Sequence, residues 1–337
     1  MWSPNYRDTW LNLIDVKDDY LIIDDCIVDY ETGLVLKDGE IVWEASNELL
    51  VWHKNWITSD PRWGDRVTRF ELILERMKEI NYNIKQKLNN LSNEPVQIDS
   101  NLTLHLLHPF NRYVYGHFYD TMQKLSIACK MDAIIDSVLL SRTHEISDIQ
   151  THLNVLLNNG VVRSADDTLG FVKVKKLLYI NPPAHPTNFT KESYTFIRQK
   201  YFNFFNIDEN IDPSKKLFLT RREGQSKRYI KNSNYIENNL KSQGVVVLDG
   251  TESLKEIVSA FSSASHIAGI HGALFMNNIF CNKQSIFREY CPISRNTRTF
   301  YDQYKLCKNY DHILIDCDEN YNVDLSLSDL KQFYDNY

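Results

Sequence analysis

The sequence predicts an α/β protein with two domains, and three observations lead to this prediction. The chain has 337 residues, about twice the length of a typical domain. Residues 20–54 contain short runs rich in valine and isoleucine, as in a β-hairpin. Residues 194–290 alternate between strand-like and helix-like segments, which favours a doubly wound parallel sheet with helices on both faces.

The hairpin prediction depends on the turn residues between the apolar runs. Thr32-Gly33 and Asp38-Gly39 separate the runs LIIDDCIVDY, GLVLKD and EIVWEAS. An Asp-Gly pair between two apolar runs is typical of a hairpin turn. A helix is expected over residues 69–91, where apolar residues recur every three or four positions. Its apolar stripe is expected to face a core, with docking on a membrane or a partner as the alternative.

The rest of the first half predicts short strands around one helix. The run LTLHLL indicates a strand, and a helix is expected to begin near Gly116. The runs AIIDSVLLS and VKVKKLLYI indicate buried strands, separated by a polar segment over residues 142–168.

Residues 181–186, NPPAHP, cannot continue a strand or a helix and are the best candidate for a linker. We therefore expect an N-terminal domain over residues 1–185 and a C-terminal domain over residues 186–310. A C-terminal segment, residues 311–337, follows, and packing back on the N-terminal domain is one arrangement open to it.

The second half shows the clearest alternation of elements. The expected order is helix 194–204, strand 216–220, helix 232–242, strand 245–248, helix 253–262, strand 266–270, helix 272–280 and strand 285–290. Sheets of this kind bind ligands at the carboxyl ends of their strands. Side chains that follow these strands are therefore the first candidates for a binding site.

Composition excludes several classes of protein. Apolar residues make up 43% of the chain and charged residues 24%, as in ordinary globular proteins. The net charge of −6 argues against a nucleic-acid-binding surface. The six cysteines are scattered without zinc-type spacing and are expected to be reduced thiols. No signal peptide or membrane span is recognisable, so we expect a cytoplasmic protein and leave peripheral membrane association open.

One segment of the chain is strongly basic. Residues 215–231 contain seven lysines and arginines against one acid, Glu223. Arg221 and Arg228 belong to a turn that contains Gly224 and follows the carboxyl end of an expected strand. Their guanidinium groups are placed to converge on a phosphate. The alternative is an ordinary solvated charged face.

A second candidate segment is His271-Gly272-Ala273, which joins a strand of small residues to a helix. Gly272 allows close approach of the backbone to a ligand, and the first helical N–H groups favour an anion. A tight turn capped by His271 is the alternative. Glu289 ends the next strand, where a carboxylate can accept hydrogen bonds from ribose hydroxyls or serve as a surface ion-pair partner.

Two further patterns contain acidic residues. His117 and Asp120 lie three residues apart at the start of a helix, so they share a face and can act as a base and its orienting carboxylate, in either assignment. The alternative gives Asp120 a helix-stabilising role and buries His117 with a backbone partner. Asp316-Cys317-Asp318 has the spelling of a metal-binding DxD motif, but we favour a turn at the end of a strand.

The order of these motifs resembles glycosyltransferase family 61. In that family an arginine, a second basic residue with a following asparagine, an HGA segment and a strand-end glutamate occur in this order. The matching positions are Arg221, Arg228, Asn232, Gly269, His271, Gly272, Ala273, Asn277 and Glu289. The segment YVYGHFYDTMQKL is similar to a first-half segment of bacterial members, with His117 and Asp120 in register. Leu274 departs from the pattern, because the family usually has a second glycine there.

The resemblance implies a GT-B fold, in which two Rossmann-like domains, here with an N-terminal β-hairpin, bind the donor mainly through the C-terminal domain. It implies inverting transfer from a nucleotide-sugar, as a family-level expectation a UDP-sugar, to a hydroxyl of a glycan or glycoconjugate, with no obligatory metal and no other cofactor. The arginines and the segment after His271 would hold the diphosphate, and His117 with Asp120 would supply the base. The alternatives are an epimerase or hydrolase of GT-B-like fold and a catalytically silent nucleotide-binding module.

Overall fold

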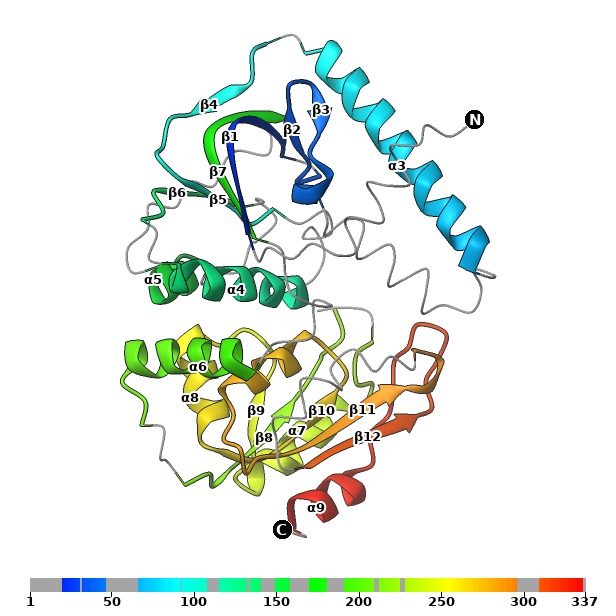
Figure 1. The fold of residues 1–337 in the computed structure, drawn as a ribbon. Helices are drawn as coiled ribbons and strands as arrows, with labels where there is room; N and C mark the ends of the chain where they lie inside the picture. The colour runs from blue at the N-terminus through cyan, green and yellow to red at the C-terminus, as the bar shows by residue number, and fades with distance from the viewer. Residues whose placement is uncertain are drawn as a thin grey trace. The chain divides into compact units, whose positions relative to one another are not determined.

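The protein was analysed as a computed structural model, in which the chain divides into two compact units, Met1–Pro186 and Thr187–Tyr337 (Figure 1). The two units are described separately below. The residues that the structure describes are 20–30, 32–46, 66–91, 93–107, 115–131, 134–140, 149–157, 170–180, 191–208, 212–224, 228–295 and 309–335.

The first unit contains a seven-stranded mixed sheet. Its strands are β1 (Tyr20–Asp29), β2 (Val35–Lys37), β3 (Glu40–Ile41), β4 (Val96–Ile98), β5 (Thr103–His105), β6 (Ser137–Leu139) and β7 (Phe171–Ile180). The order is β3-β2-β1-β7-β5-β6, with β4 beside β7. Strand β1 is antiparallel to β2 and β7, whereas β4 and β5 are parallel to β7.

The predicted N-terminal hairpins are confirmed. Asp38 and Gly39, between β2 and β3, have φ angles of 52° and 79°. Two consecutive left-handed residues form the turn that matches the twist of a hairpin, and asparagine, aspartate and glycine tolerate that conformation best. The Asp-Gly pair therefore sets this turn, as its sequence indicates.

The helices of the first unit are α3 (Arg66–Asn89), α4 (Tyr115–Lys130) and α5 (Ile149–Leu157), with a 3-10 turn η1 (Trp43–Ser46). The helices expected over residues 69–91 and from Gly116 are confirmed as α3 and α4. Met77 and Ile84 of α3, seven residues apart on one face, are buried. Helix α5 falls inside the segment expected to be polar and irregular. This helix is about two turns long, and its buried leucines Leu153 and Leu156 lie within a polar sequence, so its helical pattern is weak.

The second unit contains a five-stranded parallel sheet. Its strands are β8 (Lys215–Leu219), β9 (Val246–Leu248), β10 (Ala264–Ile270), β11 (Ile286–Pro292) and β12 (Asn309–Ile315). The helical segments are α6 (Lys191–Phe205), α7 (Ser233–Ser242), α8 (Leu254–Ser262), α9 (Leu327–Asp335) and the 3-10 segments η4 (Ala273–Phe280) and η5 (Ile293–Arg295). The alternation predicted from the sequence is confirmed to within a few residues at each boundary.

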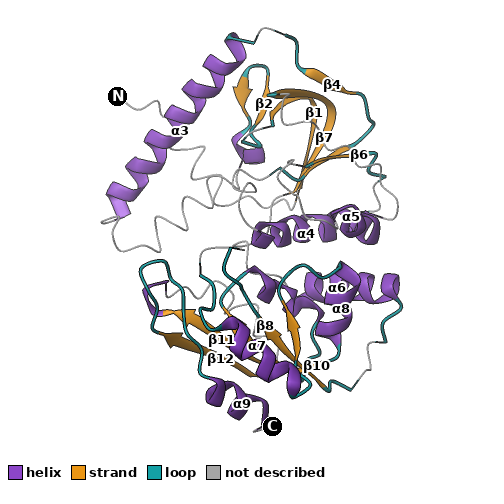
Figure 2. Ribbon diagram, turned by 180° about the vertical axis from the view of Figure 1, so that it is seen from behind, coloured by secondary structure: helices purple, strands orange, loops and turns teal. Residues whose placement is uncertain are grey.

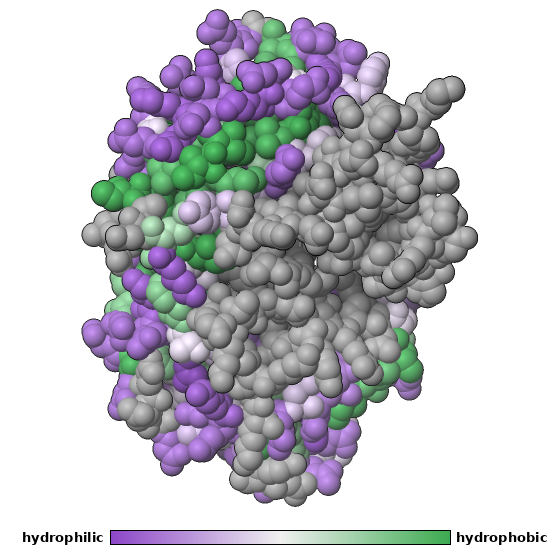
Figure 3. All heavy atoms as spheres, in the orientation of Figure 1, coloured by the Kyte–Doolittle hydropathy of each residue, from purple (hydrophilic) through white to green (hydrophobic). Residues whose placement is uncertain are grey.

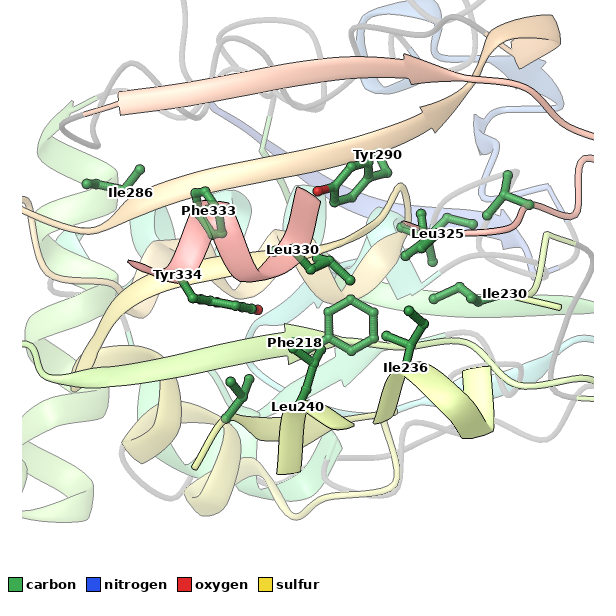
Figure 4. Close-up of a cluster of buried hydrophobic side chains, with 14 residues drawn as sticks. Phe218, Ile230, Ile236, Leu240, Ile286, Tyr290, Leu325, Leu330, Phe333 and Tyr334 are labelled. Atoms are coloured by element: carbon green, nitrogen blue, oxygen red, sulfur yellow. The ribbon is translucent and has the colours of Figure 1, made fainter. Parts of the chain in front are cut away.

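Helices cover both faces of this parallel sheet (Figure 2). On one face, Phe218 of β8 packs with Ile236 of α7 and Leu330 of α9 (Figure 4). Helices α6 and α8 pack with η4 and cover the other face. Helix α8 begins after Ser253 because the Ser253 hydroxyl accepts a bond from the Glu256 N–H, while the Glu256 carboxylate accepts from the Ser253 N–H.

The strand order β12-β11-β10-β8-β9 places a topological switch point between β8 and β10. From β8 the chain adds β9 on one side and then crosses to add β10, β11 and β12 on the other. Gly269 of β10 lies close against β8, since a Cβ atom there would lie 2.4 Å from the carbonyl oxygen of Leu219. A side chain at position 269 would therefore separate the two strands that flank the switch point.

The C-terminal segment belongs to the second sheet. Strand β12 pairs with β11 along its whole length, from Asn309 beside Ile286 to Ile315 beside Pro292. In α9, Phe333 is buried and the hydroxyl of Tyr334 donates to the carbonyl oxygen of Leu217, 2.5 Å away. These contacts place the segment with the second unit, whereas the sequence left open that it packs on the first.

The surface of the first unit carries a band of hydrophobic residues (Figure 3). Exposed apolar side chains of that unit include Tyr20, Ile22 and Val96. Among the described residues, no helix is long and apolar enough to cross a membrane.

Candidate functional site

Arg221 lies directly against Gly272 at the switch point. Arg221 follows β8 and Gly272 follows β10, and a Cβ atom added to Gly272 would lie 2.0 Å from Nη2 and 2.4 Å from Cζ of Arg221. Gly272 has a φ of 173°, an extended conformation that any residue adopts. The missing side chain, rather than backbone freedom, is therefore what this position requires. The space that the sequence suggested for a ligand is occupied by the guanidinium group of Arg221.

The strand register explains why these residues meet. Leu219 of β8 pairs with Gly269 of β10, and Arg221 and His271 each lie two residues further along. Because the strands are parallel, both residues emerge at the same edge of the sheet. After β8 the chain adds β9 on one side of the sheet, and after β10 it adds β11 and β12 on the other. Open α/β sheets bind their ligands at the edge between two such strands.

Arg228 is held close to the same edge by the backbone of its own turn. The Ile230 N–H donates to the carbonyl oxygen of Arg221, 2.9 Å away, and closes the turn. The N–H groups of Arg228 and Tyr229 both donate to Oδ1 of Asn322, at 3.2 and 3.1 Å. Arg228 has a φ of 77°, the left-handed region that non-glycine residues seldom adopt.

His271 is paired with the buried carboxylate of Glu289. Its Nδ1 lies 2.6 Å from Oε1 of Glu289, and the two side chains are 6% and 1% exposed. An ionised carboxylate only accepts hydrogen bonds, so Nδ1 of His271 carries a proton and donates. This bond fixes the plane of the imidazole ring.

The second oxygen of Glu289 is bound from the edge strand β12. Oε2 accepts from Nδ1 of His312, 3.1 Å away, and from the hydroxyl of Tyr310. Burial by itself would raise the pKa of Glu289, but the hydrogen bonds from His271, His312 and Tyr310 outweigh it and lower the pKa to about 2. Both carboxylate oxygens thus accept hydrogen bonds from side chains of the same unit, and the ribose contact expected for Glu289 stays a prediction.

The depressed pKa of Glu289 predicts a pH-dependent contribution to stability. A carboxyl group whose pKa is about 2 in the folded protein and 4.5 ordinarily stabilises the fold above pH 4.5 and loses this effect as pH falls toward 2. The contribution is on the order of 3 kcal/mol. We expect wild type to exceed Glu289→Gln in unfolding free energy at pH 6, and the difference to shrink steadily between pH 4.5 and 2. Urea unfolding at several pH values measures it, and a constant difference would contradict the prediction.

Arg222 is part of a structural ion-pair network and not of the anion site. Its guanidinium nitrogens lie 2.8 Å from Oε2 of Glu237 in α7 and 2.5 Å from Oδ2 of Asp249 after β9. The Thr220 hydroxyl also donates to Glu237. Burial tends to raise the pKa of Glu237, but the bonds from Arg222 and Thr220 bring it below its ordinary value. Arg222 therefore ties the ends of β8 and β9 to α7.

Arg222→Ala is expected to destabilise the protein without acting on an anion directly. It leaves Glu237 and Asp249, which are 5% and 8% exposed, without their shared cation. The expected loss is roughly 2–3 kcal/mol in the free energy of unfolding, measured in urea. Lys241→Ala is the control, because Lys241 is half exposed and lies 3.7 Å from Glu237, so its loss should cost less than about 1 kcal/mol. Equal effects of the two variants would contradict this assignment.

The other basic residues of segment 215–231 are spread over the unit. Lys215 and Lys216 begin β8, at the end opposite to Arg221, and Lys216 lies 3.6 Å from Asp335. Lys231 pairs with Asp324 at 2.9 Å. Gln225, Ser226 and Lys227 lie outside the described residues. The local positive charge seen in the sequence is thus distributed among separate ion pairs.

The two candidate asparagines bond to the backbone, and Ala273 begins a helical segment. The amide of Asn232 donates to the carbonyl of Leu325 and accepts from its N–H, at 2.8 and 3.1 Å. Asn277 is fully buried, and its amide donates to the carbonyl of Leu274. Ala273 begins the segment expected to be a helix, which is the 3-10 helix η4. The described bonds of both asparagines therefore hold the backbone around the site.

The proposed base residues lie in the first unit. His117 and Asp120 fall in the first turns of α4, as the sequence predicts. The structure describes the backbone of these two residues, and their side chains lie outside what it describes. Their shared helical face follows from the spacing of three residues.

Asp316-Cys317-Asp318 directly follows β12 and leads into a turn, which confirms the turn favoured from the sequence. Oδ1 of Asp318 accepts from the N–H groups of Asn320 and Asn322, both at 2.9 Å, and Oδ2 accepts from the Asn322 amide at 3.1 Å. Among the described residues, no three His, Cys, Asp or Glu side chains are grouped to hold a metal ion.

Three residues that support the site were not expected from the sequence: Tyr310, His312 and Asn322. All three belong to the segment after residue 308, where the sequence indicated the end of a strand but did not place that strand in the sheet. Had it been placed beside β11, the register of His312 next to Glu289 would have followed. The sequence pattern therefore indicated a strand, but it did not indicate that this strand pairs with β11.

A comparison with protein families gives one result that bears on this site. The sequence model of the family described as Glycosyltransferase 61 matches residues 115–287, slightly more than half of the chain. The matched range begins at α4 and includes Arg221, Arg228 and the 271–273 segment, and ends just before Glu289. No match was found among curated proteins.

Proposed function

This chain belongs to glycosyltransferase family 61, and on that premise we propose that it transfers a sugar from a UDP-sugar to a hydroxyl group of a glycan or glycoconjugate. Membership in the family implies glycosyltransferase activity. The proposal adds the donor class, an inverting reaction without an obligatory metal, and a GT-B arrangement in which the second unit binds the donor.

One observation carries the proposal: Arg221 lies against Gly272 at the switch point of the parallel sheet, where His271 also emerges. A nucleoside diphosphate brings at least two negative charges to such an edge. A guanidinium group binds phosphate oxygens in a bidentate way, and the turn that carries Arg228 begins at the same strand end. The described residues thus supply cationic and N–H donors at one edge of the sheet.

These groups fit the charge that develops during transfer. In an inverting reaction a base takes the proton of the acceptor hydroxyl, the resulting oxygen attacks the anomeric carbon, and the diphosphate leaves from the opposite face with the bonding electrons. Arg221 and Arg228 would stabilise the departing negative charge, a role that a metal ion fills in other enzymes, and Glu289 would hold His271 in a fixed orientation beside them. His117 or Asp120 of α4 would act as the base, an assignment that comes from the family pattern.

Nucleotide binding tests the donor site first. We expect UDP, compared with GDP and CMP, to raise the melting temperature and to give a measurable Kd by calorimetry. Arg221→Ala should weaken UDP binding by about 30-fold or more, as loss of a charge-assisted contact does. Lys215→Ala is the matched control, since it removes a positive charge from the other end of the same strand. A protein that binds none of the nucleotides, or equal effects of the two variants, would reject the site.

Product analysis tests the reaction. With a labelled UDP-sugar, transfer should occur only when an acceptor is present, and His117→Ala or Asp120→Ala should abolish turnover while UDP still binds. Epimerised or hydrolysed sugar without acceptor would favour the epimerase or hydrolase. Intact UDP binding without turnover for any acceptor would favour a silent binding module.

A further inference from the structure

The loop that follows β12 forms several hydrogen bonds with the turn of Arg228. The function proposed above assigns no role to these bonds. Arg228 has a left-handed backbone, which costs a non-glycine residue on the order of 1–2 kcal/mol. Such a conformation persists only where the surroundings impose it. Among the described residues, Asn322 supports this conformation, because its Oδ1 accepts from the consecutive N–H groups of Arg228 and Tyr229.

Asn322 is itself fixed by Asp318. Asn322 is 5% exposed, and both its backbone N–H and its amide donate to the carboxylate of Asp318, at 2.9 and 3.1 Å. The amide nitrogen is thereby turned toward Asp318, so the amide oxygen must face Arg228. The two residues form a relay from an acidic turn to the backbone of an arginine.

Backbone pairing keeps this loop beside the arginine turn. The Val323 N–H donates to the carbonyl of Tyr229 at 3.1 Å, and the Lys231 N–H donates to the carbonyl of Val323 at 2.8 Å. Val323 is buried in the core that includes Ile230. These bonds and the buried side chain of Val323 hold Asn322 next to the turn of Arg228.

We infer that Asp318 and Asn322 are positioning residues for the donor diphosphate site, acting through the backbone of Arg228. This inference rests on the proposed function, since it assumes that Arg228 contacts the diphosphate. The left-handed φ sets the direction in which the Arg228 side chain leaves the backbone. Because Asn322 already holds this backbone conformation, Arg228 loses less conformational freedom when the phosphate binds. It also gives the second aspartate of the DxD-like segment a function that needs no metal ion.

The first aspartate of that segment provides a matched control. None of the bonds in the relay involves Asp316, which is exposed and two residues away. A metal-binding DxD motif would need both carboxylates, whereas the positioning role needs only Asp318. Asp316→Asn and Asp318→Asn therefore distinguish the two explanations with the same chemical change.

The experiment measures the Kd of UDP by calorimetry on the full chain, with EDTA and with Mn²⁺. We expect Asn322→Ala and Asp318→Asn to weaken UDP binding by about tenfold, and Asp316→Asn to stay within about twofold of wild type, in both conditions. Equal losses for the two aspartate variants that appear only with Mn²⁺ would overturn the inference in favour of a metal site. Unchanged binding in Asn322→Ala would overturn it outright.

A double-mutant cycle separates positioning from general support of the fold. In an Arg228→Ala background, Asn322→Ala should weaken UDP binding no further, because it acts through Arg228. Additive losses would overturn the inference. If Asn322→Ala fails to fold, the same cycle is run with Asp318→Asn. A wild-type protein that binds no UDP rejects the proposed function, whereas wild-type binding with additive losses rejects only the positioning role.

Discussion

Gly272→Ala should lower kcat/KM by about 100-fold or more while the fold is retained. The added Cβ would lie 2.0 Å from Nη2 of Arg221, far inside any permitted contact, so the guanidinium group must move. The atoms that must move belong to the end of a flexible side chain, and Gly272 already has an extended backbone that alanine adopts. We therefore expect the substitution to slow the reaction, because the Arg221 charge is displaced from the developing diphosphate, and to leave the stability of the fold nearly unchanged.

Three measurements check this prediction. Steady-state kinetics gives the loss, and thermal unfolding should show a melting temperature within a few degrees of wild type. The double variant Arg221→Ala/Gly272→Ala should be no slower than Arg221→Ala alone, because the alanine at 272 acts by displacing a group already removed. If Gly272→Ala keeps activity within a few fold of wild type, the contact with Arg221 does not serve the reaction.

The second large effect is expected for Glu289→Gln, which should lower kcat by about 100-fold or more. Glutamine keeps the shape of the side chain but replaces one acceptor oxygen by an N–H₂ donor. Nδ1 of His271 and Nδ1 of His312 both donate to Glu289, so one of them then faces another donor. The imidazole of His271 then loses the hydrogen bond that fixes its tautomer and its orientation at the edge of the sheet where the diphosphate would leave.

Glu237→Gln is the matched control for this variant, as Glu237 is another buried carboxylate of the same unit that pairs with Arg222. It should lower the free energy of unfolding and leave kcat nearly unchanged. Similar kcat losses in both variants would show that Glu289 supports only the fold.

Much of the second unit could be predicted from local sequence. The apolar period within each segment distinguishes strand from helix, and turn residues such as Ser253 mark where helices begin, because these preferences act between residues close in the chain. The alternation then requires a parallel sheet, and a parallel sheet puts Arg221 and His271 at one edge. Helix α5 was missed because it is short, and the place of strand β12 in the sheet was missed because it follows the regular part of the pattern.

The partners of individual side chains could not be predicted in the same way. Arg221 and Arg222 are adjacent in the chain, yet one lies against Gly272 and the other binds Glu237 and Asp249. Glu289 receives hydrogen bonds from His312 and Tyr310 because β12 lies beside β11, a neighbour that the local sequence around Glu289 does not indicate.

The sequence by itself determined the α/β class, the order of the elements in the second unit and the family, since these depend on periodicity and on motifs of adjacent residues. The tertiary structure alone decided that Gly272 makes room for an arginine, that Glu289 orients a histidine and that Asp318 acts through Asn322 on Arg228. The reason is physical. A contact between distant residues depends on which strands become neighbours, and each such choice is made by the packing of the whole unit.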